Sequence, residues 1–141
     1  MDIQKAIQSK QKDDAFSVRR VVFIHEQKVP ESLEMDEHDE SAHHFVGYDE
    51  NIPVAAGRLR VVEDYGKLER ICVIREHRGR HFGQAIISRL EEYTKELGFH
   101  KTKLNAQTHA EDFYKSLGYE TISDTFIDAG IPHVTMVKHL N

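Results

Sequence analysis

The chain has 141 residues, of which 39% are hydrophobic and 30% charged, as in a soluble globular protein with one domain over 1–141. Its net charge of −5 argues against broad nucleic-acid binding. No apolar run approaches the ~20 residues of a membrane span, and the N-terminus lacks the apolar core of a signal peptide. The single cysteine, Cys72, excludes an internal disulfide and a cysteine-based zinc cluster, which favours the reducing cytoplasm.

The first part of the chain is predicted to form a strand and a helix. Residues 2–7 can form an edge strand. Asp13 or Asp14 can cap a helix that runs to about Gln27, and the proline of Val29-Pro30 should end it. The buried stripe of this helix is expected to comprise Val18, Val21 and Val22.

The middle of the chain is predicted to be mainly strands. Residues 31–40 contain six acidic side chains and no Lys or Arg, which indicates a loop or a short helix within a loop. The expected strands are 45–48, 52–62 and 68–74, with turns at 49–51 and 64–66.

The helix that follows Gly79 has the clearest amphipathic pattern, and Gly98 should end it. Its apolar stripe is expected to comprise Phe82, Ala85, Ile86, Leu90, Tyr93 and Leu97. A strand at 100–106, a helix at 109–117 and strands at 119–127 and 132–138 complete the chain. This order predicts a mixed sheet with helices packed on it, and a long edge strand near the C-terminus could pair two subunits as a homodimer.

Residues 73–85 join a predicted strand to this helix through a basic, glycine-containing turn. Such a turn leaves backbone N–H groups free at the positive end of the helix dipole, which suits an anion such as pyrophosphate. Gly79 and Gly83 lack Cβ and allow close approach, while Arg78 and Arg80 add positive charge. The turn therefore predicts a binder of a phosphate-bearing cofactor.

Two motifs resemble those of the GNAT superfamily of acyl-CoA N-acyltransferases, most of all its small stand-alone bacterial members of the YjcF type. The first is Ile71-Cys72-Val73 followed by Arg78-Gly79-Arg80-His81-Phe82-Gly83, and the second runs from Ala110 to Tyr119. The resemblance covers nearly the whole chain. It implies a GNAT fold of the α/β (α+β) class, with one mixed, mostly antiparallel sheet of six to seven strands and about four helices.

The resemblance also implies acetyl-CoA as the acyl donor and no metal. The strand before the loop would pair its backbone with the pantetheine arm, and Cys72 itself would be a small buried hydrophobe. His81 replaces the middle glycine of the family pattern; its Cβ could push the pyrophosphate outward, or its ring could donate to a phosphate. The implied cofactor-binding residues are Cys72, Val73, Arg78, Gly79, Arg80, His81, Phe82, Gly83, Gln84, Asn105 and Tyr114.

Two side chains are predicted to be catalytic. Tyr114 matches a family tyrosine near the thioester sulfur, where a phenol can protonate the departing thiolate; alternatively it is one of several core aromatics. Glu69 resembles a glutamate of amino-sugar acetyltransferases. Strand alternation would put it on the same face as Ile71 and Val73, where partial burial would raise its pKa and make it a base. The alternative is a salt bridge to a neighbouring Arg.

The acceptor is expected to lie beside residues 31–40, whose carboxylates, Glu34 and Asp36 among them, would attract a cationic amine. A solvated acidic loop is the alternative. Gln107 and His133 are predicted to contact the acceptor, although Asn105 and Gln107 could instead cap the following helix. His43, His44, His109 and His133 lack the spacing of a known zinc motif.

These features predict direct transfer of an acetyl group from acetyl-CoA to a primary amine of a small molecule or peptide in a ternary complex. The competing hypothesis is a non-catalytic acyl-CoA sensor or interaction module, and the change at His81 is its sequence support. A mononucleotide-binding domain is less consistent, because the chain has neither a glycine-rich dinucleotide fingerprint nor a Lys-Ser/Thr phosphate loop. No nucleic-acid or membrane partner is expected.

Overall fold

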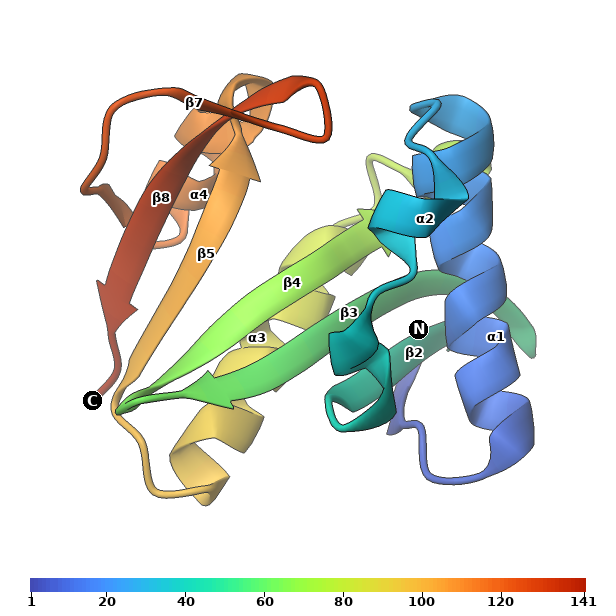
Figure 1. The fold of residues 1–141 in the computed structure, drawn as a ribbon. Coiled ribbons are helices and arrows are strands. Elements are labelled where there is room, and N and C mark those ends of the chain that lie inside the picture. The colour runs from blue at the N-terminus through green and yellow to red at the C-terminus, as the bar shows by residue number, and fades with distance from the viewer.

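The computed structural model describes residues 1–141 and contains one eight-stranded sheet in the order β1-β2-β3-β4-β5-β8-β6, with β7 also paired to β8 (Figure 1). The predicted mixed, mostly antiparallel sheet is confirmed, with β4 and β5 as its parallel pair. The strands are β1 (Asp2–Lys5), β2 (His43–Asp49), β3 (Ile52–Val62), β4 (Tyr65–Val73), β5 (Lys101–Gln107), β6 (Glu120–Thr121), β7 (Phe126–Asp128) and β8 (Ile131–His139).

Four α-helices and several short helical turns connect the strands. The α-helices are α1 (Ser9–Arg19), α2 (Glu31–Glu34), α3 (Phe82–Glu96) and α4 (Glu111–Ser116). A π-helical segment, η1 (Arg20–Glu26), continues α1, and the 3-10 turns are η2 (Glu37–Glu40), η3 (Arg75–His77) and η4 (Thr108–Ala110). No helix is both long and apolar enough to cross a membrane.

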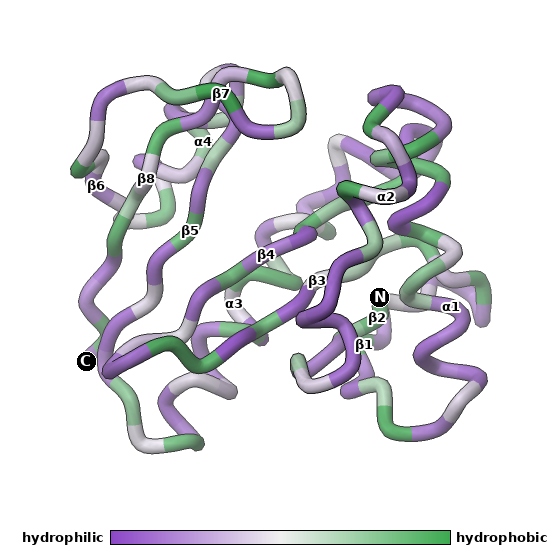
Figure 2. The backbone as a smooth tube through the Cα atoms, viewed as in Figure 1, coloured by the Kyte–Doolittle hydropathy of each residue, from purple (hydrophilic) through white to green (hydrophobic).

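The two longest helices cover opposite faces of the sheet. Helix α3 buries Ile86, Ile87 and Leu90 against the larger core, while α1 buries Ala15 and Val18 against a smaller one. Figure 2 shows that α1 is largely hydrophilic along its length, as expected for a helix with one narrow buried stripe.

The start of α1, its buried stripe and the end of the stripe on α3 differ from the prediction. Helix α1 begins at Ser9 rather than at Asp13 or Asp14, because the Gln11 side chain accepts the backbone N–H groups of Ile7 and Gln8. Val21 is 46% exposed, since it is off the stripe that Val18 and Val22 share at a spacing of four residues. Leu97 caps the C-terminus of α3 and is 38% exposed, and Gly98 ends the helix with a φ of 94°.

Strands β4 and β5 part after a short parallel pairing. Their register runs only from Gly66 opposite Thr102 to Leu68 opposite Leu104. Beyond it Arg70 has a φ of 57°, and the register of β4 against β3 shifts at the same point. This bulge turns the end of β4 away from β5, so that the two strands open into a V (Figure 1).

The bulge also overturns the predicted face of Glu69. Ile71 and Val73 pack toward α3, whereas Cys72 packs against the smaller core under α1. Glu69 bonds to Arg58 on that same α1 side. The prediction that Glu69 shares a face with Ile71 and Val73 is therefore wrong, because the extra residue at Arg70 interrupts the alternation of the strand.

The C-terminal strand is not an edge strand. β8 pairs with β5 along its length and with β6 and β7 on its other side. The expected single strand over 119–127 is broken into these two short pieces, which raises the strand count to eight. A subunit contact through a free edge of β8 is therefore wrong, because β6 and β7 occupy that edge.

Candidate active site

The turn between β4 and α3 presents a row of unused backbone donors. None of the backbone N–H groups from Gly79 to Gln84 donates to an acceptor in the protein, and the first intrahelical bond runs from Ala85 to His81. These donors lie at the N-terminus of a helix of 15 residues, where the helix dipole adds partial positive charge. The arrangement suits an anion with several oxygen atoms, as the sequence predicted.

His81 adopts the backbone conformation that a glycine would supply. It precedes α3 with φ 64° and ψ 19°, in the left-handed region, which histidine enters more readily than most residues. The path of the turn is therefore kept despite the departure from the family pattern. An added Cβ at Gly83 would meet only Val73 Cγ2, at 3.8 Å, so space inside the protein does not require that glycine.

The arginines of the turn are held by carboxylates that the sequence did not single out. Arg78 donates through Nε to the Val73 carbonyl at 2.9 Å and through both terminal nitrogens to Glu26, each at 2.7 Å. Hydrogen bonding from Arg78 lowers the pKa of Glu26. Arg80 donates to Asp49 at 3.0 Å. Both arginines therefore fix the turn to the rest of the fold, and their charges are balanced rather than free.

The outer edge of β4 offers backbone groups to the V. The Ile74 N–H donates to Val54 of β3, so alternation directs the N–H and C=O of Val73 to the other side. The C=O accepts from Arg78 there, and the N–H remains free toward the opening. Cys72 is 5% exposed, and burial raises the pKa of its thiol to about 12. These features fit the predicted backbone role of Val73 and the reading of Cys72 as a buried small residue rather than a nucleophile.

Tyr114, from the second motif, reaches the end of β4. Its ring packs edge-to-face on Tyr119 at 5.8 Å and on Phe113 at 5.2 Å, and its hydroxyl has no hydrogen-bond partner in the protein. Burial raises the pKa of Tyr114 above its usual range, and the neighbouring Cys72 adds to the rise. The phenol therefore stays protonated and has an unused donor near the predicted thioester position.

Glu69 is held by three basic side chains. Its carboxylate accepts from Arg58 at 2.7 Å and from Arg60 at 2.8 Å, and Lys67 lies 3.3 Å away. Burial alone would raise the pKa of Glu69, but Arg60, Arg58 and Lys67 outweigh it and lower the pKa to about 2. The predicted raised pKa is therefore wrong, and the alternative of a salt bridge describes this residue.

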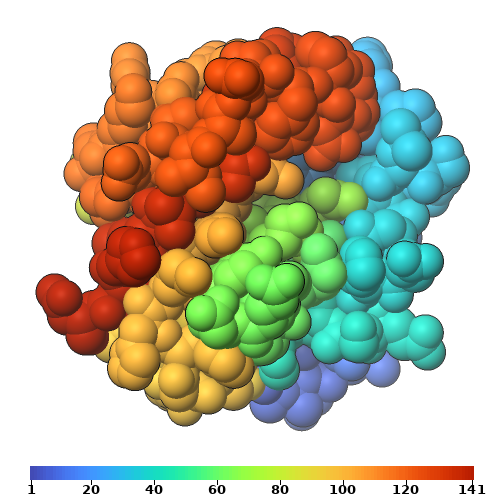
Figure 3. Space-filling model, turned by 60° about the vertical axis from the view of Figure 1, so that its left-hand side comes forward, coloured from blue at the N-terminus to red at the C-terminus, as the bar shows by residue number.

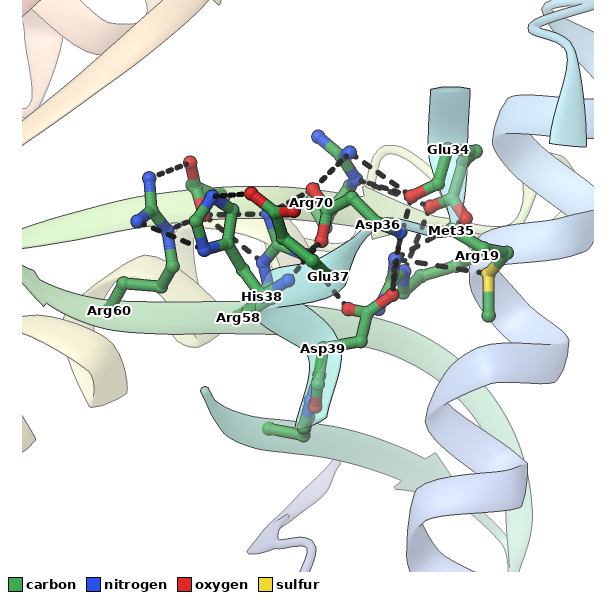
Figure 4. A network of polar contacts seen from close by, with 12 residues as sticks. Arg19, Glu34, Met35, Asp36, Glu37, His38, Asp39, Arg58, Arg60 and Arg70 are labelled. Carbon is green, nitrogen blue, oxygen red and sulfur yellow. Dashed lines mark hydrogen bonds and ion pairs between the residues drawn. The ribbon is translucent and has the colours of Figure 1, made fainter. Parts of the chain in front are cut away.

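The carboxylates predicted to attract the acceptor are also paired. Glu34 is 2% exposed and accepts from Arg19 at 2.8 Å. Asp36 accepts from Arg58 at 2.7 Å, and Asp39, which the sequence did not single out, bonds both Arg19 and Arg58 (Figure 4). The inward carboxylates Glu34, Asp36 and Asp39 neutralise buried arginines and are not free attractors. Glu31, Glu37 and Glu40 are exposed, so the alternative of a solvated acidic loop describes only that part of the segment.

The remaining predicted residues lie on the β5 arm of the V. Gln107 and His133 are paired across β5 and β8. Gln107 donates to the side chain of Gln27 at 3.0 Å, which joins the end of β5 to the end of η1. His133 bonds the Ile131 carbonyl through Nδ1 at 2.7 Å, and Asn105 accepts from Thr135 at 2.8 Å. Neither Asn105 nor Gln107 caps α4 through its side chain.

Comparison with known proteins gives the chain its family. A model of the acetyltransferase (GNAT) domain matches residues 7–140. YjcF of Bacillus subtilis, an uncharacterized N-acetyltransferase, is 48% identical over 89% of this chain and 90% of its own.

Solved structures show the same fold. An acyl-CoA N-acyltransferase from Pseudomonas aeruginosa superposes with a TM-score of 0.87 at 22% identity, covering 98% of this chain and 99% of its own. An aminoglycoside 6′-N-acetyltransferase complexed with coenzyme A does so with a TM-score of 0.77 at 16% identity, covering 99% and 97%. With the splayed β4 and β5, the unused donors of the turn and these matches, the chain belongs to the GNAT family of acetyltransferases.

Proposed function

We propose that this acetyltransferase moves the acetyl group of acetyl-CoA to a primary amine by direct attack in a ternary complex. The observation that carries the proposal is the row of unused N–H groups from Gly79 to Gln84 beside the open edge of β4. The pyrophosphate would accept from these donors, and the pantetheine arm would lie along the edge at Val73. In the space-filling view, a recess separates the orange-red C-terminal segment from the green β3–β4 hairpin and cyan α2 (Figure 3).

The transfer needs a donor for the carbonyl oxygen and one for the leaving sulfur. The Val73 N–H would polarise the thioester carbonyl as the amine nitrogen forms its bond to carbon. The C–S bond then breaks, and Tyr114 donates its proton toward the departing sulfur while the nitrogen gives up one of its own. The products are the acetylated amine and the free thiol of CoA, so the protons balance without an external acid.

Glu69 is not assigned as the base in this scheme. A carboxylate with a pKa of about 2 is a weak base, and an amine is far more basic, so proton transfer from the amine to Glu69 is unfavourable. Its contacts give it a structural role instead, since it neutralises Arg58 and Arg60 at the acceptor side of β4. The amine would therefore enter as its free base, and after attack its nitrogen would lose one of its two protons to the Tyr114 phenolate or to solvent.

Release of CoA thiol from acetyl-CoA, measured with a panel of primary amines, tests the proposal. We expect amine-dependent release and a product of matching mass. The control is Gly83→Val, whose Cβ fits beside Val73 but whose branched side chain would cover the donors. It should fold and bind acetyl-CoA at least about tenfold more weakly. Absence of both turnover and acetyl-CoA binding in calorimetry would refute the proposal.

A further inference from the structure

The sheet face on the acceptor side is partly uncovered and carries basic side chains. Helix α1 packs on β2, β3 and β4 but not on β5. Leu104 and Ala106 of β5 point into the core under α3, so Lys103 and Asn105 point to the opposite, uncovered face. This face adjoins the point where β4 and β5 part, and it is therefore the approach to the V.

Two lysines stand side by side at that point. Lys67 of β4 and Lys103 of β5 are register partners, and like charges in that position repel one another. Lys67 is balanced by Glu69 at 3.3 Å. Lys103 lies over the ring of Tyr65 at 4.6 Å and has no carboxylate partner. The fold thus keeps one unneutralised cation beside the opening.

Arg70 places a second unused donor on the other arm. Its Nε and one terminal nitrogen bond the Glu34 carbonyl, and the same terminal nitrogen bonds Asp36 at 3.1 Å. The other terminal nitrogen, Nη1, has no partner and in Figure 4 points away from the network. Burial and the nearby Arg58 lower the pKa of Arg70, while its partners Glu34 and Asp36 act against that shift.

Asn105 contributes a third donor. Its Oδ1 accepts from Thr135 at 2.8 Å, which fixes the amide and leaves Nδ2 without an acceptor. The side chain is exposed on the same face as Lys103, two residues further along β5. Arg70 Nη1, Lys103 Nζ and Asn105 Nδ2 therefore come from both arms of the V, and none of these three nitrogens has a hydrogen-bond or carboxylate partner within the protein.

Resting on the proposed function, we infer that the acceptor is an amine that also carries an anionic group, a carboxylate or a phosphate, which Arg70, Lys103 and Asn105 bind. A guanidinium, an ammonium and an amide N–H all donate to oxyanions and none accepts from an ammonium. Glu34, Asp36 and Asp39 are paired with arginines, so none of these three carboxylates is free to bind a second ammonium group. Recognition of the second group would place the amine at the thioester.

The test compares kcat/KM for matched acceptors. β-Alanine is measured against its amide, phosphoethanolamine against ethanolamine, and putrescine serves as the dication. We expect one anionic member to exceed its neutral partner at least about tenfold, and added salt to shrink that ratio. The pair that shows the larger ratio identifies the anion as carboxylate or phosphate.

Variants then assign the effect. Lys103→Gln and Asn105→Ala are surface changes that should reduce the ratio severalfold through the KM of the anionic acceptor. In Lys103→Gln the KM of acetyl-CoA should be unchanged. Arg70→Gln should reduce the ratio further. Lys101→Gln is the matched control, since Lys101 is on the same strand face but is paired with Asp64 at 3.5 Å.

Equal or better use of the neutral amines or putrescine would overturn the inference and leave acetyl transfer standing. An anion preference unchanged in Lys103→Gln, Asn105→Ala and Arg70→Gln would also overturn it. No turnover of any amine would remove the acetyl-transfer proposal and this inference with it.

Discussion

Replacing Tyr114 by Phe separates chemistry from packing at the end of β4. The ring keeps its contacts with Phe113 and Tyr119, and the hydroxyl that is lost bonds nothing in the protein. The free energy of unfolding should therefore change by no more than about 0.5 kcal/mol. If the hydroxyl protonates the leaving thiolate, kcat should fall about 10²–10⁴-fold, which is about 3–5 kcal/mol of barrier. The affinity for acetyl-CoA should stay the same.

Tyr119→Phe is the matched control, because the rings of Tyr114 and Tyr119 pack together and the two residues differ in whether the hydroxyl is hydrogen-bonded. The Tyr119 hydroxyl bonds Thr102 at 2.9 Å and donates to Glu91 at 2.8 Å. Its loss leaves those partners unsatisfied and should destabilise the protein by about 1–3 kcal/mol, with kcat nearly unchanged. The two variants should thus show opposite patterns in urea unfolding and in steady-state kinetics.

The pH dependence gives a further check on Tyr114. Burial disfavours the phenolate, so the raised pKa keeps the donor protonated, and the wild-type kcat should not decline from this group below about pH 10. A kcat for Tyr114→Phe within about twofold of the parent would show that the ring only packs. The donor would then have to be another group, with His133 the next candidate.

Three other predictions follow from the same contacts. Because the folded pKa of Glu69 is lowered from 4.5 to about 2, its stabilisation of about 3 kcal/mol is present above pH 4.5 and is lost as the pH falls toward 2. Glu69→Gln should accordingly be less stable than the parent in urea at pH 7, and its stability should fall less as the pH is lowered. A kcat more than about 100-fold lower in the folded variant would restore the role of Glu69 as the base. His81→Gly should be as stable as the parent or slightly more stable, since an L-residue at this φ costs about 1–2 kcal/mol. It should also bind acetyl-CoA as well as the parent or better. Weaker binding, with a larger difference at low pH, would show that the imidazole contacts a phosphate. Cys72 should react with a thiol reagent at neutral pH only after unfolding, and rapid labelling of the native protein would contradict its raised pKa.

Local patterns predicted the elements of this fold well. The stripe of α3 and the glycine after it are readable because helical spacing and a left-handed C-terminal residue are local properties. The bulge in β4 was not predictable in this way. It is placed at Arg70, a residue type with no preference for a positive φ, and nothing nearby signals an extra residue in the strand.

The part of the candidate site that consists of backbone N–H donors could be predicted from the sequence. The part that depends on ion pairs between distant residues could not. The donors after Gly79 follow from a strand, a turn and a helix in order. The partners of the basic turn, Glu26 and Asp49, are 52 and 31 residues from their arginines, and charge alone does not select them. The same holds for Glu69, whose partners decide the sign of its pKa shift.

The end of η1 holds both arms of the V. Glu26 bonds Arg78 at the turn after β4, and Gln27 bonds Gln107 at the end of β5, over separations of 52 and 80 residues. Hairpins such as β2–β3 can form from neighbours in the chain, but these two bonds require the first helix, the loop and the fifth strand to be in place together. Contacts between such distant segments raise the contact order of the fold. The width of the cofactor opening therefore depends on a segment that belongs to neither of the two strands.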